Sequence, residues 1–124
     1  MLSKEQFGEF VMPDLRRMTS YMERSMYHLD GVEQMRFIDQ LATLPKLAAI
    51  QWNPSKPHDL SEHMSDFKRI RGLGLSLFLT VRSVDDAVYM TKSLGPDGLC
   101  MSLPYFDDES DALAAIARIE AAAK

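Results

Sequence analysis

The sequence predicts an α/β protein: a four-stranded parallel sheet of βα units, preceded by an N-terminal helical segment. Two observations lead to this prediction. Short apolar runs alternate four times with longer segments whose apolar residues recur at helical spacing. Residues with capping side chains precede the helical segments, and Gly or Pro follows the end of several of these segments. Such alternation is typical of right-handed βαβ crossovers and a parallel sheet.

The N-terminal segment, residues 3–24, has a helical pattern with Phe7, Phe10 and Val11 on one face. Pro13 interrupts this pattern, and a proline in such a place either kinks a helix or begins a new one. We therefore predict two helical pieces or one kinked helix over residues 1–24. Four βα units then follow in residues 25–124, and together they make a single α/β domain.

The four βα units begin with apolar runs and continue with amphipathic segments. Asp30, Asp59 and Ser83 each stand three residues before an acid, which predicts that they are the N-caps of three of the helices. The expected strands are residues 26–29, 47–52, 75–81 and 99–103, and the expected helices are residues 32–44, 60–71, 84–94 and 111–123.

Composition excludes several classes of protein. The 124 residues carry 14 basic and 18 acidic side chains, a formal charge of −4, without the basic stripe of a nucleic-acid-binding protein. No apolar run approaches the ~20 residues of a membrane span, and the N-terminus does not resemble a signal peptide. We expect a cytoplasmic protein that binds neither nucleic acid nor membrane. Cys100 is the single cysteine, so no intrachain disulfide can form, and its place within a strand predicts a buried side chain.

The predicted sheet leaves one face without cover. Crossovers of one hand place all four helices on the same face, whereas parallel sheets normally have both faces covered. The N-terminal helices can cover the second face and form a third layer. Alternatively, a second copy of the chain covers it, so that two half-barrels close and remove both sheet edges. The chain is too short for a complete β/α barrel, which needs roughly 200 residues.

Function gathers at the carboxyl ends of parallel strands, so residues 28–31, 51–54, 80–83 and 102–105 all qualify as places for a site, and the first two carry the candidate residues. His28 and Asp30 point the same way from the first strand, and this imidazole and carboxylate can bind a metal ion or act as a base and its orienting group. The structural alternative is that Asp30 only caps the next helix.

The second strand ends in Gln51, Trp52 and Asn53, an aromatic ring between two amides. The ring can stack on a ligand while the amides form hydrogen bonds. The structural alternative places Trp52 in the core and makes Asn53 part of a turn. No residue is assigned a catalytic role. The predicted ligand-binding residues are His28, Asp30, Gln51, Trp52 and Asn53.

Two motifs carry a resemblance to a known family. SMYHLDG at residues 25–31, followed by AIQWNP at residues 49–54, resembles the C-terminal half of the uroporphyrinogen decarboxylase-like superfamily, which includes the corrinoid-dependent methyltransferases. FVMP at residues 10–13 and LGPDGL at residues 94–99 also fit. The resemblance implies half of a TIM-type β/α barrel: its last four βα units and the helix that precedes them.

The resemblance also implies a cofactor and a partner. In the methyltransferases a zinc-bound thiol accepts the methyl group, and their H-x-C-G motif corresponds to His28 and Asp30, with Asp30 in place of the cysteine. Zinc is the implied cofactor, with His28 and Asp30 as candidate ligands and Cys100 near the strand that supplies a further cysteine. The implied partner is a second copy in a homo-oligomer or a complementary N-terminal half-barrel chain.

Two functions follow from this sequence. One is a half-barrel module that binds a small molecule at its strand ends and needs a second chain for a complete site. The alternative is a non-catalytic α/β assembly or binding module, in which the same residues only cap and pack.

Overall fold

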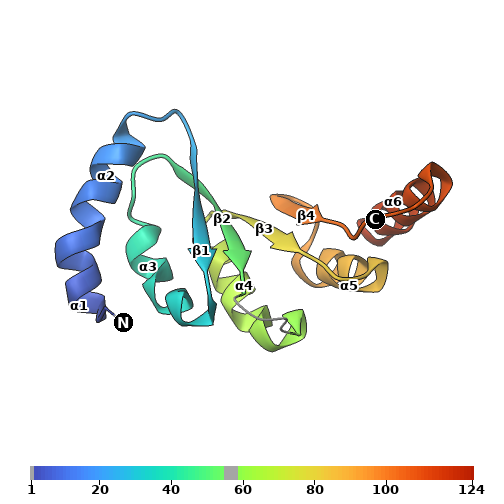
Figure 1. The fold of residues 1–124 in the computed structure, drawn as a ribbon, viewed down its shortest axis with the longest axis horizontal. Coiled ribbons are helices and arrows are strands. Elements are labelled where there is room, and N and C mark those ends of the chain that lie inside the picture. The colour runs from blue at the N-terminus through green and yellow to red at the C-terminus, as the bar shows by residue number, and fades with distance from the viewer. Residues whose placement is uncertain (1, 55–58) are drawn as a thin grey trace.

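The computed structural model describes residues 2–54 and 59–124 and contains one four-stranded parallel sheet. The strand order is β1-β2-β3-β4, so each strand pairs with the next one in the chain. Figure 1 shows the helices interleaved with these strands. The predicted fold class is therefore confirmed. The strands are β1 Ser25–Asp30, β2 Leu47–Asn53, β3 Ser76–Thr80 and β4 Leu99–Ser102.

The helical segments also lie close to the predicted ranges. Pro13 occupies the first turn of α2, and one turn of π-helix precedes it. The N-terminal segment is thus a continuous series of helical turns. The segments are α1 Lys4–Gln6, η1 Phe7–Val11, α2 Met12–Ser20, η2 Val32–Phe37, α3 Ile38–Leu41, η3 Leu60–His63, α4 Met64–Gly72, α5 Val84–Leu94 and α6 Glu109–Ala122.

Two of the three predicted caps are present. Asp59 Oδ1 accepts a hydrogen bond from the Ser61 backbone N–H at 2.8 Å, and hydrogen bonding by the Ser61 side chain, together with this backbone bond, lowers the pKa of the Asp59 carboxyl. Ser83 Oγ accepts one from the Asp86 N–H at 3.0 Å. The prediction for Asp30 was wrong, because η2 begins after Gly31 and has no side-chain cap. Gly31 has a φ of 85°, so the chain turns there before the helix begins.

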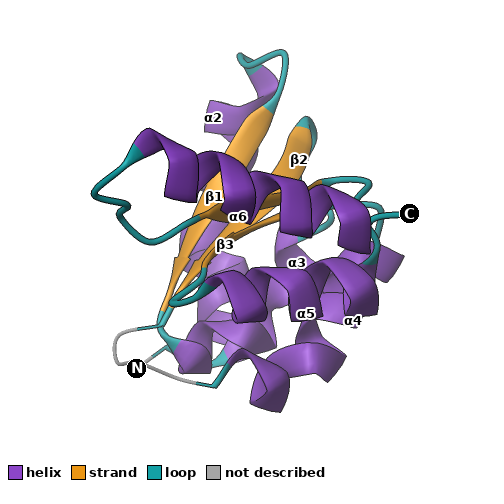
Figure 2. Cartoon of the chain, turned by 90° about the vertical axis from the view of Figure 1, so that its right-hand side faces the viewer, coloured by secondary structure: helices purple, strands orange, loops and turns teal. Residues whose placement is uncertain are grey.

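The hydrophobic core lies between the sheet and the helices that follow its strands. Figure 2 shows α3, α4 and α5 on the same side of the strands. Alternate strand residues point toward these helices and are fully buried, each contributing about 1.5–3 kcal/mol relative to an exposed side chain. The most deeply buried of these strand residues are Leu29, Ile50, Trp52, Leu77 and Leu79, and they share the core with Ile38, Leu41, Phe67, Ile70 and Met90.

The N-terminal helices pack against the segment that follows β1. The Phe7 ring stacks on Phe37 with centroids 4.1 Å apart, and Arg16 Nη1 donates to the Thr43 carbonyl at 3.2 Å. This position leaves the other face of the sheet without a third layer among the described residues (Figure 1). The predicted arrangement in which the N-terminal helices cover the second face is therefore not the one observed. We call the sheet face opposite the helices the open face.

Candidate functional site

The open face carries side chains from all four strands in two rows. The strand register aligns His28 with Gln51, Gln51 with Phe78, and Phe78 with Cys100. A second row lies nearer the carboxyl end, where Asp30 is paired with Asn53, and Thr80 with Ser102. Because side chains alternate along a strand, every member of these rows points away from the helical layer.

Two hydrogen-bonded pairs join β1 to β2 on this face. His28 Nδ1 lies 3.0 Å from Gln51 Oε1, and Asn53 Nδ2 donates to Asp30 Oδ1 at 3.3 Å. Because an amide oxygen only accepts hydrogen bonds, the neutral imidazole carries its proton on Nδ1. Nε2 of His28 therefore keeps its lone pair. The two pairs orient a base and a carboxylate side by side on an exposed surface.

These side chains can accept hydrogen bonds from a ligand or take a proton from it. His28 Nε2 and the second carboxylate oxygen of Asp30 are acceptors, whereas the Gln51 amide also offers N–H donors. A mixture of donors and acceptors at the carboxyl ends of adjacent strands is typical of small-molecule sites in α/β proteins.

The residues do not fit a zinc centre within a single chain. Zinc sites use three or four protein ligands, and residues 2–54 and 59–124 contain no cluster of three or more His, Cys, Asp or Glu able to hold an ion. Cys100 lies three strand spacings from His28, roughly 14 Å across the sheet. The two residues therefore cannot share an ion here.

Trp52 is separated from the other predicted ligand-binding residues. It is only 1% exposed and lies on the helical side of the sheet. Its ring lies 5.2 Å from that of Phe67 in an edge-on arrangement and 4.8 Å from that of His63. This is the core position weighed as the structural alternative. Gln51 and Asn53 flank it in β2 and face the opposite way.

Cys100 is exposed, which contradicts the predicted burial. Its neighbours Leu99 and Met101 point toward the helices and pack against the core, so Cys100 faces the open side. Phe78, Thr80 and Ser102 belong to the same rows and were not among the five predicted ligand-binding residues, although Thr80 and Ser102 lie at strand ends that qualified as places for a site. The alternation of the third and fourth predicted strands contained the signal that would have identified them.

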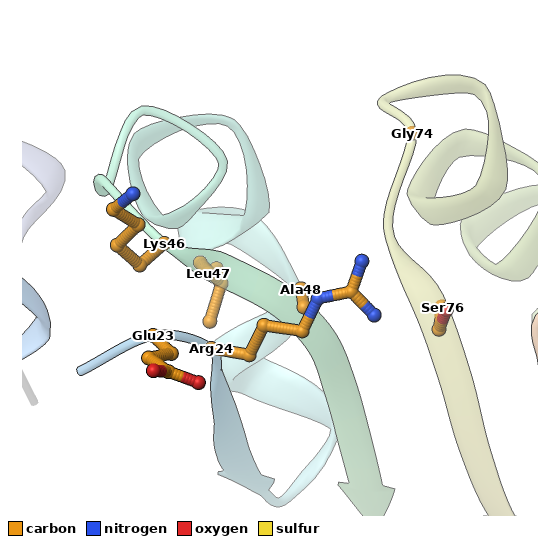
Figure 3. A pocket seen from close by; sticks show the side chains of 7 residues that line it. All are labelled: Glu23, Arg24, Lys46, Leu47, Ala48, Gly74 and Ser76. Atoms are coloured by element: carbon orange, nitrogen blue, oxygen red, sulfur yellow. The ribbon is translucent and has the colours of Figure 1, made fainter.

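A hollow of ≈ 390 Å³ lies at the opposite end of the sheet, where the strands begin. Figure 3 shows Arg24 extended across β2 toward Ser76, with Lys46 turned away from it. The lining includes both acidic and basic side chains, and it lies away from His28 and Asp30. The lining residues are Glu23, Arg24, Lys46, Leu47, Ala48, Gly74 and Ser76.

In the described part of the chain, no helix has the length and apolar character needed to cross a membrane. Comparison with known proteins identifies no relative: no family model, no curated protein and no solved structure matches this chain.

Proposed function

We propose that this chain is a half-barrel module related to the uroporphyrinogen decarboxylase-like superfamily. It binds a small molecule at the carboxyl ends of its strands, and a second chain completes the site. One observation carries the proposal: the open face presents two oriented polar pairs, His28 with Gln51 and Asp30 with Asn53.

The uncovered open face of the sheet supports the proposal of a second chain. Parallel sheets are normally buried on both faces, yet Met26 on the open face of β1 is 51% exposed. The free edges of β1 and β4 would also disappear if four more strands closed the barrel. The same closure would convert an exposed surface into a cavity that excludes water from a ligand.

The motifs behind the resemblance support the position of the site. SMYHLDG forms β1 and its exit, and AIQWNP forms most of β2 and its exit. The polar residues of both motifs face the same side and bond to each other across the two strands. A zinc-bound thiol is not part of the proposal, because Asp30 occupies the cysteine position.

The experiment is a small-molecule fragment screen followed by amide chemical shifts in the folded protein. We expect shifts to cluster at the ends of β1 and β2, and to vanish in the double variant His28→Ala/Asp30→Ala. A matched control, Glu62→Ala/Lys68→Ala, changes two exposed side chains of the helical layer and should leave binding intact. Equal binding by the His28→Ala/Asp30→Ala variant would contradict the proposed site.

A second candidate is a non-catalytic assembly module. The same hydrogen bonds support it if their role is structural. Cross-strand polar pairs stabilise sheets by about 0.2–1 kcal/mol each, so the two pairs could serve only to join β1 to β2. In that case Gln51→Ala would lower the free energy of unfolding by this amount, and no fragment would bind at the strand ends.

A further inference from the structure

We propose that the chain completing this half-barrel is not a second copy, but a different chain with four parallel strands and only three helices. This inference rests on the proposed function and names the partner. The observation behind it is that helices flank the sheet at both of its free edges, α2 at β1 and α6 at β4 (Figure 1).

In residues 2–54 and 59–124, the helical layer contains one helical segment more than the sheet has strands. The segments ending in α3, α4 and α5 connect consecutive strands, whereas α2 precedes β1 and α6 follows β4. A closed eight-stranded β/α barrel has eight helices, one outside each gap between strands. Four strands with five helical segments therefore require a complement of four strands with three helices.

At the β1 edge, the outer position is already occupied by α2. A hollow of ≈ 180 Å³ is lined there by Leu15, Met18, Thr19 and Met22 on one side and by residues 25–28 of β1 on the other. Met18 is 54% exposed and Met22, just beyond the end of α2, is 43% exposed, so the two present an apolar flank beside a free strand. We call Met18, Met22 and Met26 the β1 seam.

At the β4 edge, α6 holds the corresponding position. A hollow of ≈ 180 Å³ is lined there by Met101, Leu103, Ile116, Ile119 and Glu120. Ile116 is 43% exposed. We call Leu103, Leu113 and Ile116 the β4 seam, because α6 presents Leu113 and Ile116 beside the other free strand and Leu103 directly follows that strand.

A second copy does not fit between these seams. If β4 of one copy paired with β1 of another, α6 of the first and α2 of the second would compete for one gap. Strands lie about 4.8 Å apart and packed helices 8–10 Å apart, so the outer layer over one gap holds a single helix. Two copies would bring ten helical segments to eight strands.

The required partner has a defined surface chemistry. Its two outer strands pair in parallel with β4 and β1, and its first and third helices present apolar faces to the β4 and β1 seams. The same polypeptide must therefore contact both Ile116, at the β4 edge of this chain's sheet, and Met22, at its β1 edge.

The test places a photo-crosslinking residue at Met22 or at Ile116 in the full chain, in cells that make the protein naturally. Lys68, exposed on α4 away from both seams, is the control position. We expect one and the same heterologous chain to be crosslinked at both seams and not at Lys68. Its sequence should contain four predicted strands separated by three predicted helices.

The alternative outcomes separate this inference from the proposed function. A product of two 14.1 kDa copies at both seams overturns the inference and leaves the need for a second chain standing. The absence of any product at either seam overturns both. A single heterologous product, together with undiminished fragment binding by the His28→Ala/Asp30→Ala variant, supports the partner and contradicts the ligand site.

A measurement on the purified chain provides an independent check. Sedimentation velocity should give a 14.1 kDa monomer up to millimolar concentration, with the backbone amides of β1 and β4 exchanging faster than those of β2 and β3. A dimer that protects both edge strands would overturn the inference.

Discussion

Asp30 ends β1 with its carboxylate on the open face, where it accepts a hydrogen bond from Asn53. It makes no contact that caps η2. Ser83 has the opposite role, because its hydroxyl satisfies a backbone N–H in the first turn of α5. The two residues looked equivalent as caps in the sequence, yet only Ser83 acts on helix stability, and Asp30 remains available for a ligand.

We predict that Asp30→Ala changes the free energy of unfolding by no more than about 0.5 kcal/mol, as for other exposed side chains. Ser83→Ala should cost about 1 kcal/mol, the usual loss for an N-cap. Urea unfolding followed by the fluorescence of Trp52, the single tryptophan, measures both changes. A larger loss for Asp30→Ala than for Ser83→Ala would show that Asp30 is a structural residue.

At the scale of elements, β4 depends on the turn that precedes it. Arg71, at the end of α4, donates hydrogen bonds to the carbonyls of Leu75 at 3.2 Å, Gly98 at 3.1 Å and Asp97. Gly98 has a φ of 65°, and a Cβ at this position would overlap the Arg71 guanidinium. One side chain therefore joins the exit of α4 to the entries of β3 and β4.

We predict that Gly98→Ala destabilises the protein by at least about 1–2 kcal/mol, because it adds left-handed strain and displaces Arg71. Gly72→Ala is the matched control: nothing lies within 4 Å of its added Cβ, and it sits in the last turn of α4. That variant should be neutral or more stable by up to about 1 kcal/mol. Thermal or urea unfolding of the two variants tests the contrast, and equal stabilities would contradict the role of Arg71.

At the scale of the whole molecule, the sheet is covered on one face only. All of the fully buried strand side chains point to the helices, whereas the opposite rows end in exposed polar groups and Cys100. The arrangement resembles one half of a closed barrel more than a complete three-layer domain. The exposed thiol offers a direct measure of this asymmetry.

We predict that Cys100 in the folded protein reacts with a thiol-specific reagent at a rate comparable to that of the unfolded chain, because its side chain is open to solvent. A complementary chain that closes the barrel should slow this reaction strongly. The absorbance change on reaction with Ellman's reagent, followed in a stopped-flow or a conventional spectrophotometer, gives the rate. If Cys100 reacted only after unfolding, the open face would be covered in solution.

Local sequence predicted most of the elements and part of the site. The four strands and the helices of the βα units lie within a few residues of their predicted ranges, and Asp59 and Ser83 cap as expected. The carboxyl ends of β1 and β2 carry His28 and Gln51, as the predicted strand ranges implied. These features depend on apolar periodicity and on caps formed within a few residues, so the chain encodes them by near neighbours alone.

The sequence by itself therefore determined the order of βα units and the polar residues at the strand ends. Only the tertiary structure decided that the N-terminal helices pack beside α3 and leave a face open. It also decided that Asp30 bonds to Asn53 across the strands, that Trp52 lies in the core, and that Cys100 is exposed. The physical reason is that each of these outcomes depends on contacts between segments far apart in the chain, which a local pattern does not specify.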